Sequence, residues 1–168
     1  GLPIVPPTED RVRAMTDYVK SALGWKPDDA IGKLAPKNAV ATVEKIAANA
    51  VMAGCRAEYM PVLIACVKGF SEPKFNLDAV QTSTHNTSVL PIVNGPIGKS
   101  IDLNCGYNYT GSRWQSTSTI GRALRLIMAN VGGTPGSVNI HTQGHIARYE
   151  YCIAENEDEN PWEPLHVE

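Results

Sequence analysis

The sequence lacks the features that identify several large classes of protein. None of its apolar runs approaches the roughly 20 residues that a helix needs to cross a bilayer, so we expect no membrane span. Its first residues have neither the basic start nor the apolar centre of a signal peptide. The 15 lysines and arginines are scattered and the net charge is −2. No basic stripe is available to neutralise phosphates, so we expect no nucleic-acid partner.

The chain also has few cysteines, and their spacing matches no known disulfide or metal motif. The four cysteines, Cys55, Cys66, Cys105 and Cys152, are widely spaced and form no CxxC pair. Disulfide frameworks are typical of short secreted chains, whereas 168 residues can bury a sufficient core without them. We therefore expect reduced thiols and a cytoplasmic location. Because the chain starts at Gly1 and not at a methionine, we also expect an N-terminal segment or a processing step in the full gene product.

The composition is that of an ordinary globular protein, with 43% hydrophobic and 19% charged residues. Apolar residues at helical spacing predict helices at residues 8–23, 42–53, 58–67 and 116–131. Short β-branched runs predict strands at 80–84, 89–93, 101–105 and 149–153, and residues 25–38 are predicted to be a connecting loop. The predicted fold is mixed α/β of the α+β type, a single compact domain over residues 1–168 with helices around a small mixed sheet.

Two stretches in the middle of the chain carry candidate site residues. The start of the helix near residue 116 combines free amides and hydroxyls with positive charge, which predicts an anion site at Arg113, Thr119 and Arg122. A well-capped helix explains the same residues, and neither the Walker nor the dinucleotide fingerprint is present. The polar stretch 81–88 contains Thr84 and His85, and histidine is suited to acid–base chemistry near neutral pH. A hydroxyl-rich turn is the alternative there.

Further candidates lie in the last third of the chain and at Asn94. His141 and His145 are four residues apart, but Gly144 argues against a helix and no third ligand follows, so we expect no metal. Glu155 follows the predicted strand 149–153, at the end where ligands bind open α/β sheets, and Asn94 follows the strand 89–93. The segment from Trp162 onward is apolar enough to pin the C-terminus or to contact another subunit.

Several long blocks have a familiar form: GLPIVPPTE, TVEKIAANAVMAGCRAEYMPVL, NGPIG, TIGRALRLIMANVGG and AENEDENPWEPLHVE. Together they resemble an uncharacterised bacterial family, over nearly the whole chain. In relatives of that family, similar chains stand beside or are joined to a small domain named for a UGSC motif, and that motif is absent here. The resemblance implies a bacterial enzyme or one part of a two-component protein, and it assigns no catalytic residue.

The leading functional hypothesis is an enzyme with lyase- or hydrolase-type chemistry that acts on a small polar or anionic substrate. His85 would move a proton, Glu155 would act with it, and Thr84, Asn94, Arg113, Thr119 and Arg122 would bind the substrate. No nucleotide cofactor is expected, because no fingerprint for one is present. The alternatives are a thiol-based redox protein that uses Cys55 or Cys105, and a non-catalytic subunit that binds a partner or forms a homo-oligomer.

Overall fold

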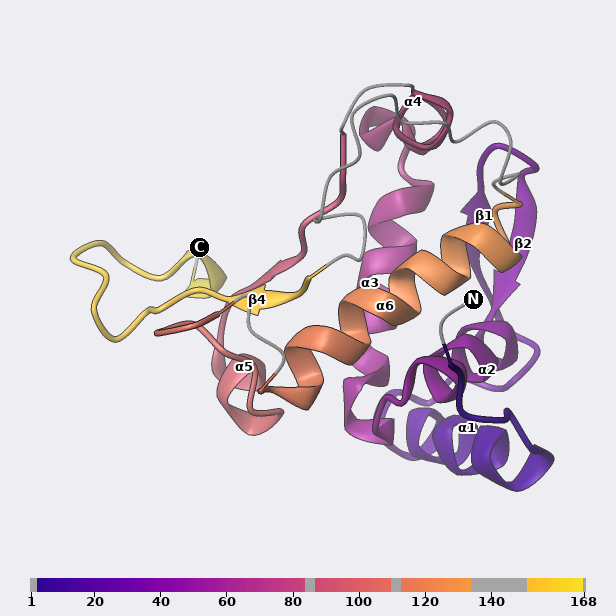
Figure 1. Ribbon diagram of the computed structural model, residues 1–168, viewed down its shortest axis with the longest axis horizontal. Helices are drawn as coiled ribbons and strands as arrows, with labels where there is room; N and C mark the ends of the chain where they lie inside the picture. Colours follow the sequence, from indigo (N-terminus) through magenta and orange to yellow (C-terminus); the bar gives the residue numbers. More distant parts are fainter. Residues whose placement is uncertain (1–2, 84–86, 110–112, 134–150, 168) are drawn as a thin grey trace.

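The computed structural model describes residues 3–83, 87–109, 113–133 and 151–167 (Figure 1). The α-helices are α1 (Glu9–Leu23), α2 (Val43–Ala53), α3 (Met60–Ser71), α4 (Leu77–Thr82), α5 (Pro96–Ser100) and α6 (Gln115–Asn130). The strands are β1 (Ala30–Leu34), β2 (Ala39–Thr42), β3 (Ile92–Val93) and β4 (Ile153–Ala154), and single 3-10 turns are formed by Ala57–Tyr59, Pro73–Phe75 and Leu165–Val167. The predicted α+β class is confirmed, with the described strands divided between two small sheets.

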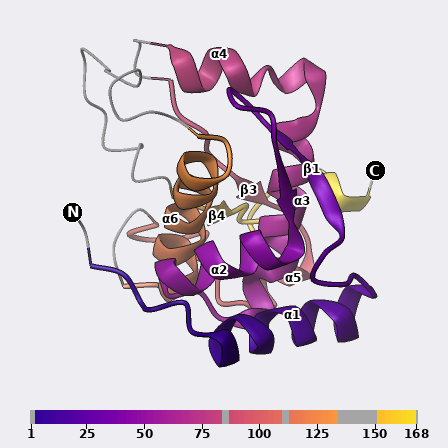
Figure 2. The ribbon, with the colours of Figure 1, turned by 90° about the vertical axis from the view of Figure 1, so that its right-hand side faces the viewer.

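The helices form the body of the protein, with α2 between α1 and α6 (Figure 2). Small side chains on α2, such as Ala47 and Ala50, let its neighbours approach closely, and both are fully buried. Leu63 of α3 and Leu124 of α6 are also fully buried in this core. Burial of these apolar side chains supplies the main stabilisation of the body.

Local signals placed the ends of α2 correctly. Thr42 Oγ1 accepts a hydrogen bond from the amide of Lys45 at 3.3 Å, as expected of an N-cap. Gly54 ends the helix with φ of 88°, in the left-handed region that favours glycine. The predicted helices near residues 8–23, 58–67 and 116–131 are confirmed as α1, α3 and α6.

The predicted loop at residues 25–38 is wrong over part of its length. It contains β1, which pairs antiparallel with β2 so that Gly32 lies opposite Ala41. A Cβ on Gly32 would lie 1.9 Å from Ser71 Oγ at the end of α3. Glycine here therefore lets the hairpin pack directly on α3, whereas in the sequence it indicates a loop.

Two predicted strands are also wrong. Residues 80–82 belong to α4, whose first turn is capped by Asn76 Oδ1 accepting from the amide of Ala79 at 3.4 Å. Residues 101–105 form no strand: 101 and 102 are a turn, 103–105 are irregular, and the Asn104 carbonyl accepts a hydrogen bond from the Ala154 amide at 3.1 Å. Short apolar runs do not distinguish helix from strand, so such errors are expected.

The second sheet places the candidate site. β3 and β4 run parallel, with Ile92 opposite Ile153, so the predicted strands 89–93 and 149–153 are confirmed at their C-terminal ends. The amide of Glu155 donates to the Val93 carbonyl at 3.1 Å. Because both strands point the same way, the residues that follow them lie side by side. No helix in the described ranges has the length and apolar character needed to cross a bilayer.

Candidate functional site

Asn94 and Glu155, two of the predicted site residues, meet at the carboxyl ends of β3 and β4. Asn94 Nδ2 donates a hydrogen bond to Glu155 Oε2, and Asn160 Nδ2 donates to Glu155 Oε1 at 2.9 Å. Asn160 Oδ1 in turn accepts from the amide of Trp162 at 3.1 Å. Both oxygens of the Glu155 carboxylate are thus held, and the chain that leaves β4 folds back over the end of β3.

A second carboxylate in this turn holds a histidine. Glu157 Oε1 lies 2.8 Å from His166 Nδ1 and accepts a hydrogen bond from the Gly95 amide at 2.9 Å. The side chains of Glu157 and His166 are 14% and 34% exposed. Gly95 has φ of 89°, and a Cβ there would lie 3.2 Å from His166 Cγ, so glycine leaves the room that the ring occupies.

The ionisation of Glu157 decides which ring nitrogen of His166 donates the hydrogen bond. Partial desolvation raises the pKa of Glu157, but hydrogen bonds from His166 and the Gly95 amide, with the charges of His166 and Lys99, lower its pKa below the usual range overall. Glu157 is therefore ionised at neutral pH and can only accept. His166 Nδ1 therefore donates the hydrogen of this contact, and Nε2 is the ring nitrogen left to exchange a proton.

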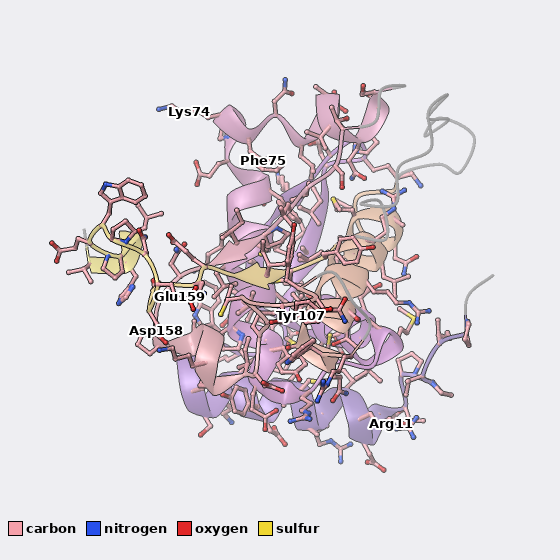
Figure 3. All side chains as sticks on the ribbon, turned by 60° about the vertical axis from the view of Figure 1, so that its left-hand side comes forward. Arg11, Lys74, Phe75, Tyr107, Asp158 and Glu159 are labelled. Carbon is pink, nitrogen blue, oxygen red and sulfur yellow. The ribbon has the colours of Figure 1, made fainter. Side chains whose placement is uncertain are left out.

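An ion pair closes the outer side of the turn. Lys99 Nζ, on α5, lies 2.7 Å from both carboxylate oxygens of Asp158, and both side chains are exposed. Asp158 is labelled in Figure 3. The hydrogen bond to Asp158 raises the pKa of the Lys99 ammonium, and the charges of Glu157 and Cys105 also raise it. An exposed pair of this kind contributes little to stability, but it orients the segment.

The predicted anion site at the start of α6 lies in different surroundings. Thr119 Oγ1 donates to the Gln115 carbonyl at 2.7 Å, and Arg122 Nη2 donates to the Pro3 carbonyl. The Arg113 guanidinium lies 5.4 Å from the ring centroid of Trp114. These predicted donors thus contact the chain itself, and no described contact joins them to Glu155.

The cysteines differ sharply in exposure. Cys55 is buried, its Sγ donates to the Thr119 carbonyl at 3.3 Å, and burial raises the pKa of its thiol to about 12. Burial likewise raises the pKa values of Cys66 and Cys152. Cys105 is the exposed member of the four. These features disfavour a reactive Cys55 and leave Cys105 as the candidate thiol.

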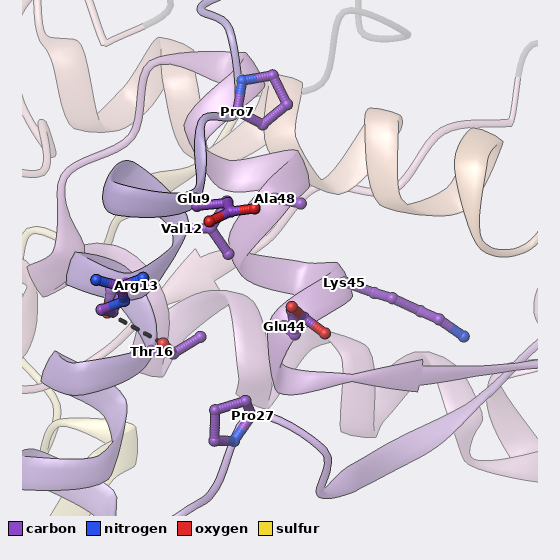
Figure 4. A pocket seen from close by; sticks show the side chains of 9 residues that line it. All are labelled: Pro7, Glu9, Val12, Arg13, Thr16, Pro27, Glu44, Lys45 and Ala48. Atoms are coloured by element: carbon purple, nitrogen blue, oxygen red, sulfur yellow. Dashed lines mark hydrogen bonds between the residues drawn. The ribbon is translucent and has the colours of Figure 1, made fainter.

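An open cavity of about 600 Å³ lies between α1 and α2 (Figure 4). Its charged lining residues also have structural roles: Lys45 Nζ donates to the Val40 carbonyl at 2.8 Å, and Arg13 pairs with Asp10 at 3.6 Å. Glu9 and Glu44 are in the first turns of α1 and α2, where a negative charge stabilises the helix. The cavity contains none of the predicted site residues.

Several predicted residues cannot be placed. Thr84, His85, His141 and His145 lie outside the described residues. Within the described ranges, no group of three or more His, Cys, Asp or Glu side chains is arranged to hold a metal.

The sequence reasoning missed His166. Its partner Glu157 is nine residues away, across a turn of acidic residues, and the Gly95 amide comes from a distant part of the chain. A histidine close after a run of carboxylates is the one sequence signal that could have indicated the pair.

Comparison with known proteins adds no relative. No protein-family model, curated protein or solved structure matches this chain. Its function is therefore inferred from the geometry of its own residues.

Proposed function

We propose that this chain is an enzyme of the hydrolase or lyase type that acts on a small polar substrate, with His166 as the general base. The observation that carries the proposal is the 2.8 Å contact between His166 Nδ1 and Glu157 Oε1. A carboxylate that orients an imidazole and stabilises its protonated form is the usual arrangement for proton transfer. Nε2 would remove a proton from water or from the substrate, and would return it to the leaving group.

Asn94 and Asn160 supply groups that would position the substrate. Each Nδ2 gives one hydrogen to Glu155 and has a second hydrogen to donate. The surrounding turn is acidic, since residues 155–159 contain four carboxylates and Lys99 is paired with Asp158. This balance favours a neutral or cationic polar substrate over the anionic one expected from the start of α6.

The test uses a panel of small polar esters, amides and hydroxy or amino compounds, with turnover followed by proton NMR. For any member that the wild-type protein converts, we expect His166→Gln to lower kcat/KM by roughly 10²–10⁴-fold. Glu157→Gln should also lower kcat, because a neutral amide stabilises the imidazolium less than a carboxylate does. Tyr107→Ser, at a side chain that is almost fully exposed, is the matched control and should leave the rate unchanged. Turnover that survives in His166→Gln, or no turnover of any member, contradicts the proposal.

A thiol-based redox protein is the second candidate, because Cys105 is the exposed one of the four cysteines. A thiol must be accessible to react with a substrate. Fast alkylation by iodoacetamide at mildly acidic pH, absent in Cys105→Ser, would support this candidate. Labelling no faster than that of a small free thiol would rule it out.

A further inference from the structure

An apolar groove of about 350 Å³ lies between α3 and β3. One wall is formed by α3, including Val62, Ala65 and Cys66, and the other by β3 and Ile97 of α5. All its lining residues are apolar, and none takes part in the His166 site. The groove is therefore suited to an apolar side chain rather than to a polar substrate.

The strand that borders the groove has a free edge. β4 bonds to Pro91 and Val93, so the peptide N–H and C=O of Ile92 point away from it, and the described residues offer them no partner. The side chains of Leu90 and Ile92 are 49% and 55% exposed. An exposed apolar edge next to a groove is a surface where another chain adds readily.

The C-terminal part of the chain has apolar side chains that the described residues leave exposed. Residues 155–167, here called the C-terminal arm, project from the body beyond β4 (Figure 1). Trp162, Leu165 and Val167 of the arm are 78%, 62% and 56% exposed. Contacts of Asp158 with Lys99 and of Glu157 with Gly95 fix the base of the arm, while these apolar side chains point into solvent.

We propose that a second copy of this chain occupies the groove, with the arm of each copy packed into the groove of the other. The groove and the exposed side chains of the arm are both apolar. In a two-fold dimer each arm covers the groove of the other copy, so all four apolar surfaces are buried without a further partner. A buried tryptophan alone removes about 150–250 Å² from water. Two arms, with two aliphatic side chains each and the grooves that cover them, bury on the order of 1,000 Å², which is close to what a specific interface needs.

Analytical ultracentrifugation of the whole chain at micromolar concentration tests whether the dimer forms through the arm and the groove. The wild-type protein is expected to be a dimer, and both Trp162→Glu and Ala65→Glu are expected to be monomers. Both substitutions are at exposed positions, so circular dichroism should show an intact fold. Tyr107→Glu, at the 95% exposed aromatic outside the groove, is the matched control and should remain a dimer.

Mixing the two variants tests which surface meets which. Trp162→Glu retains its groove and Ala65→Glu retains its arm, so the mixture should associate more strongly than either variant alone, through one restored contact. A monomeric wild-type protein overturns the proposal, as does a dimer that either substitution leaves intact. A mixture that associates no more strongly than the separate variants, at any concentration reached, overturns it too.

Discussion

The helical body and the C-terminal arm are held by different forces. In the body, residues such as Ile46, Leu63 and Leu124 have no exposed surface, and α2 is packed on both sides by other helices. In the described residues 151–167, by contrast, Cys152 is the buried side chain, and the contacts are carboxylates paired with His166, Lys99 and two asparagines. The body thus depends on apolar burial and the arm on charge and hydrogen bonds.

Because of this difference, the body provides the stability of the protein, whereas the proposed chemistry lies in the arm. Apolar burial is insensitive to protonation, so the body keeps its shape as conditions change. Hydrogen bonds to ionised groups exist only over the pH range in which those groups are charged. The proposed proton-transfer group therefore lies in the part of the molecule whose structure itself responds to pH.

The largest expected effect is a loss of stability when a side chain in the core of the body is truncated. Leu124→Ala removes a fully buried side chain between α6 and α2 and should lower the free energy of unfolding by about 2–5 kcal/mol, measured by urea denaturation. Leu23→Ala, at a side chain 41% exposed at the end of α1, is the matched control and should change stability by less than about 1 kcal/mol. Equal losses in the two variants would show that burial does not decide stability here.

A smaller and more local effect is expected in acid, where protonation of Glu157 should release the arm from Gly95. The folded pKa of Glu157 is below its unfolded value of about 4.3, so its contribution is complete above that pH and is lost as the pH falls through the folded pKa. The Gly95 amide resonance should then shift in NMR spectra, while that of Leu124 stays in place. Glu157→Gln should remove the transition, and Glu9→Gln should keep it. A Leu124 resonance that shifts over the same pH range would contradict independent release.

The raised pKa of Lys99 predicts that the arm also loosens at high pH. Its folded pKa is above the unfolded value, so the contact with Asp158 contributes fully below the unfolded pKa and is lost as the pH rises through the folded one. The arm should therefore be most ordered between these two limits.

The smallest expected effect compares two neighbouring buried hydroxyls in the first turn of α6. Ser116 Oγ donates to the Asp102 carbonyl at 2.6 Å, whereas the fully buried Thr117 Oγ1 has no hydrogen-bond partner among the described residues. Ser116→Ala should lower the free energy of unfolding by about 1 kcal/mol, and Thr117→Val should raise it by up to about 1 kcal/mol. Urea midpoints that move in the same direction would contradict this reading of the two hydroxyls.

Sequence reasoning succeeded where the signals are local. The cap at Thr42, the stop at Gly54 and the apolar spacing between them define α2 within a dozen residues. It failed at β1, because the pairing with β2 and the close approach of Gly32 to Ser71 are not visible in residues 25–38. It also failed at α4, because a short apolar run fits both periods.

The candidate site divides in the same way. Asn94 and Glu155 were both named as candidates because each follows a predicted strand, whereas their hydrogen bond depends on the parallel pairing of β3 with β4, which the sequence does not reveal. The pair of Glu157 and His166 was not predicted, since it requires a fold-back of the arm and an amide from Gly95.

The sequence by itself determined the α+β class, the four long helices and the ends of β3 and β4, because caps and apolar periodicity act between residues a few positions apart. Only the tertiary structure decided that Cys55 is buried while Cys105 is exposed, that Arg122 contacts the Pro3 carbonyl, and that His166 pairs with Glu157. These outcomes depend on contacts between residues far apart in the chain, and such contacts follow from how the helices pack.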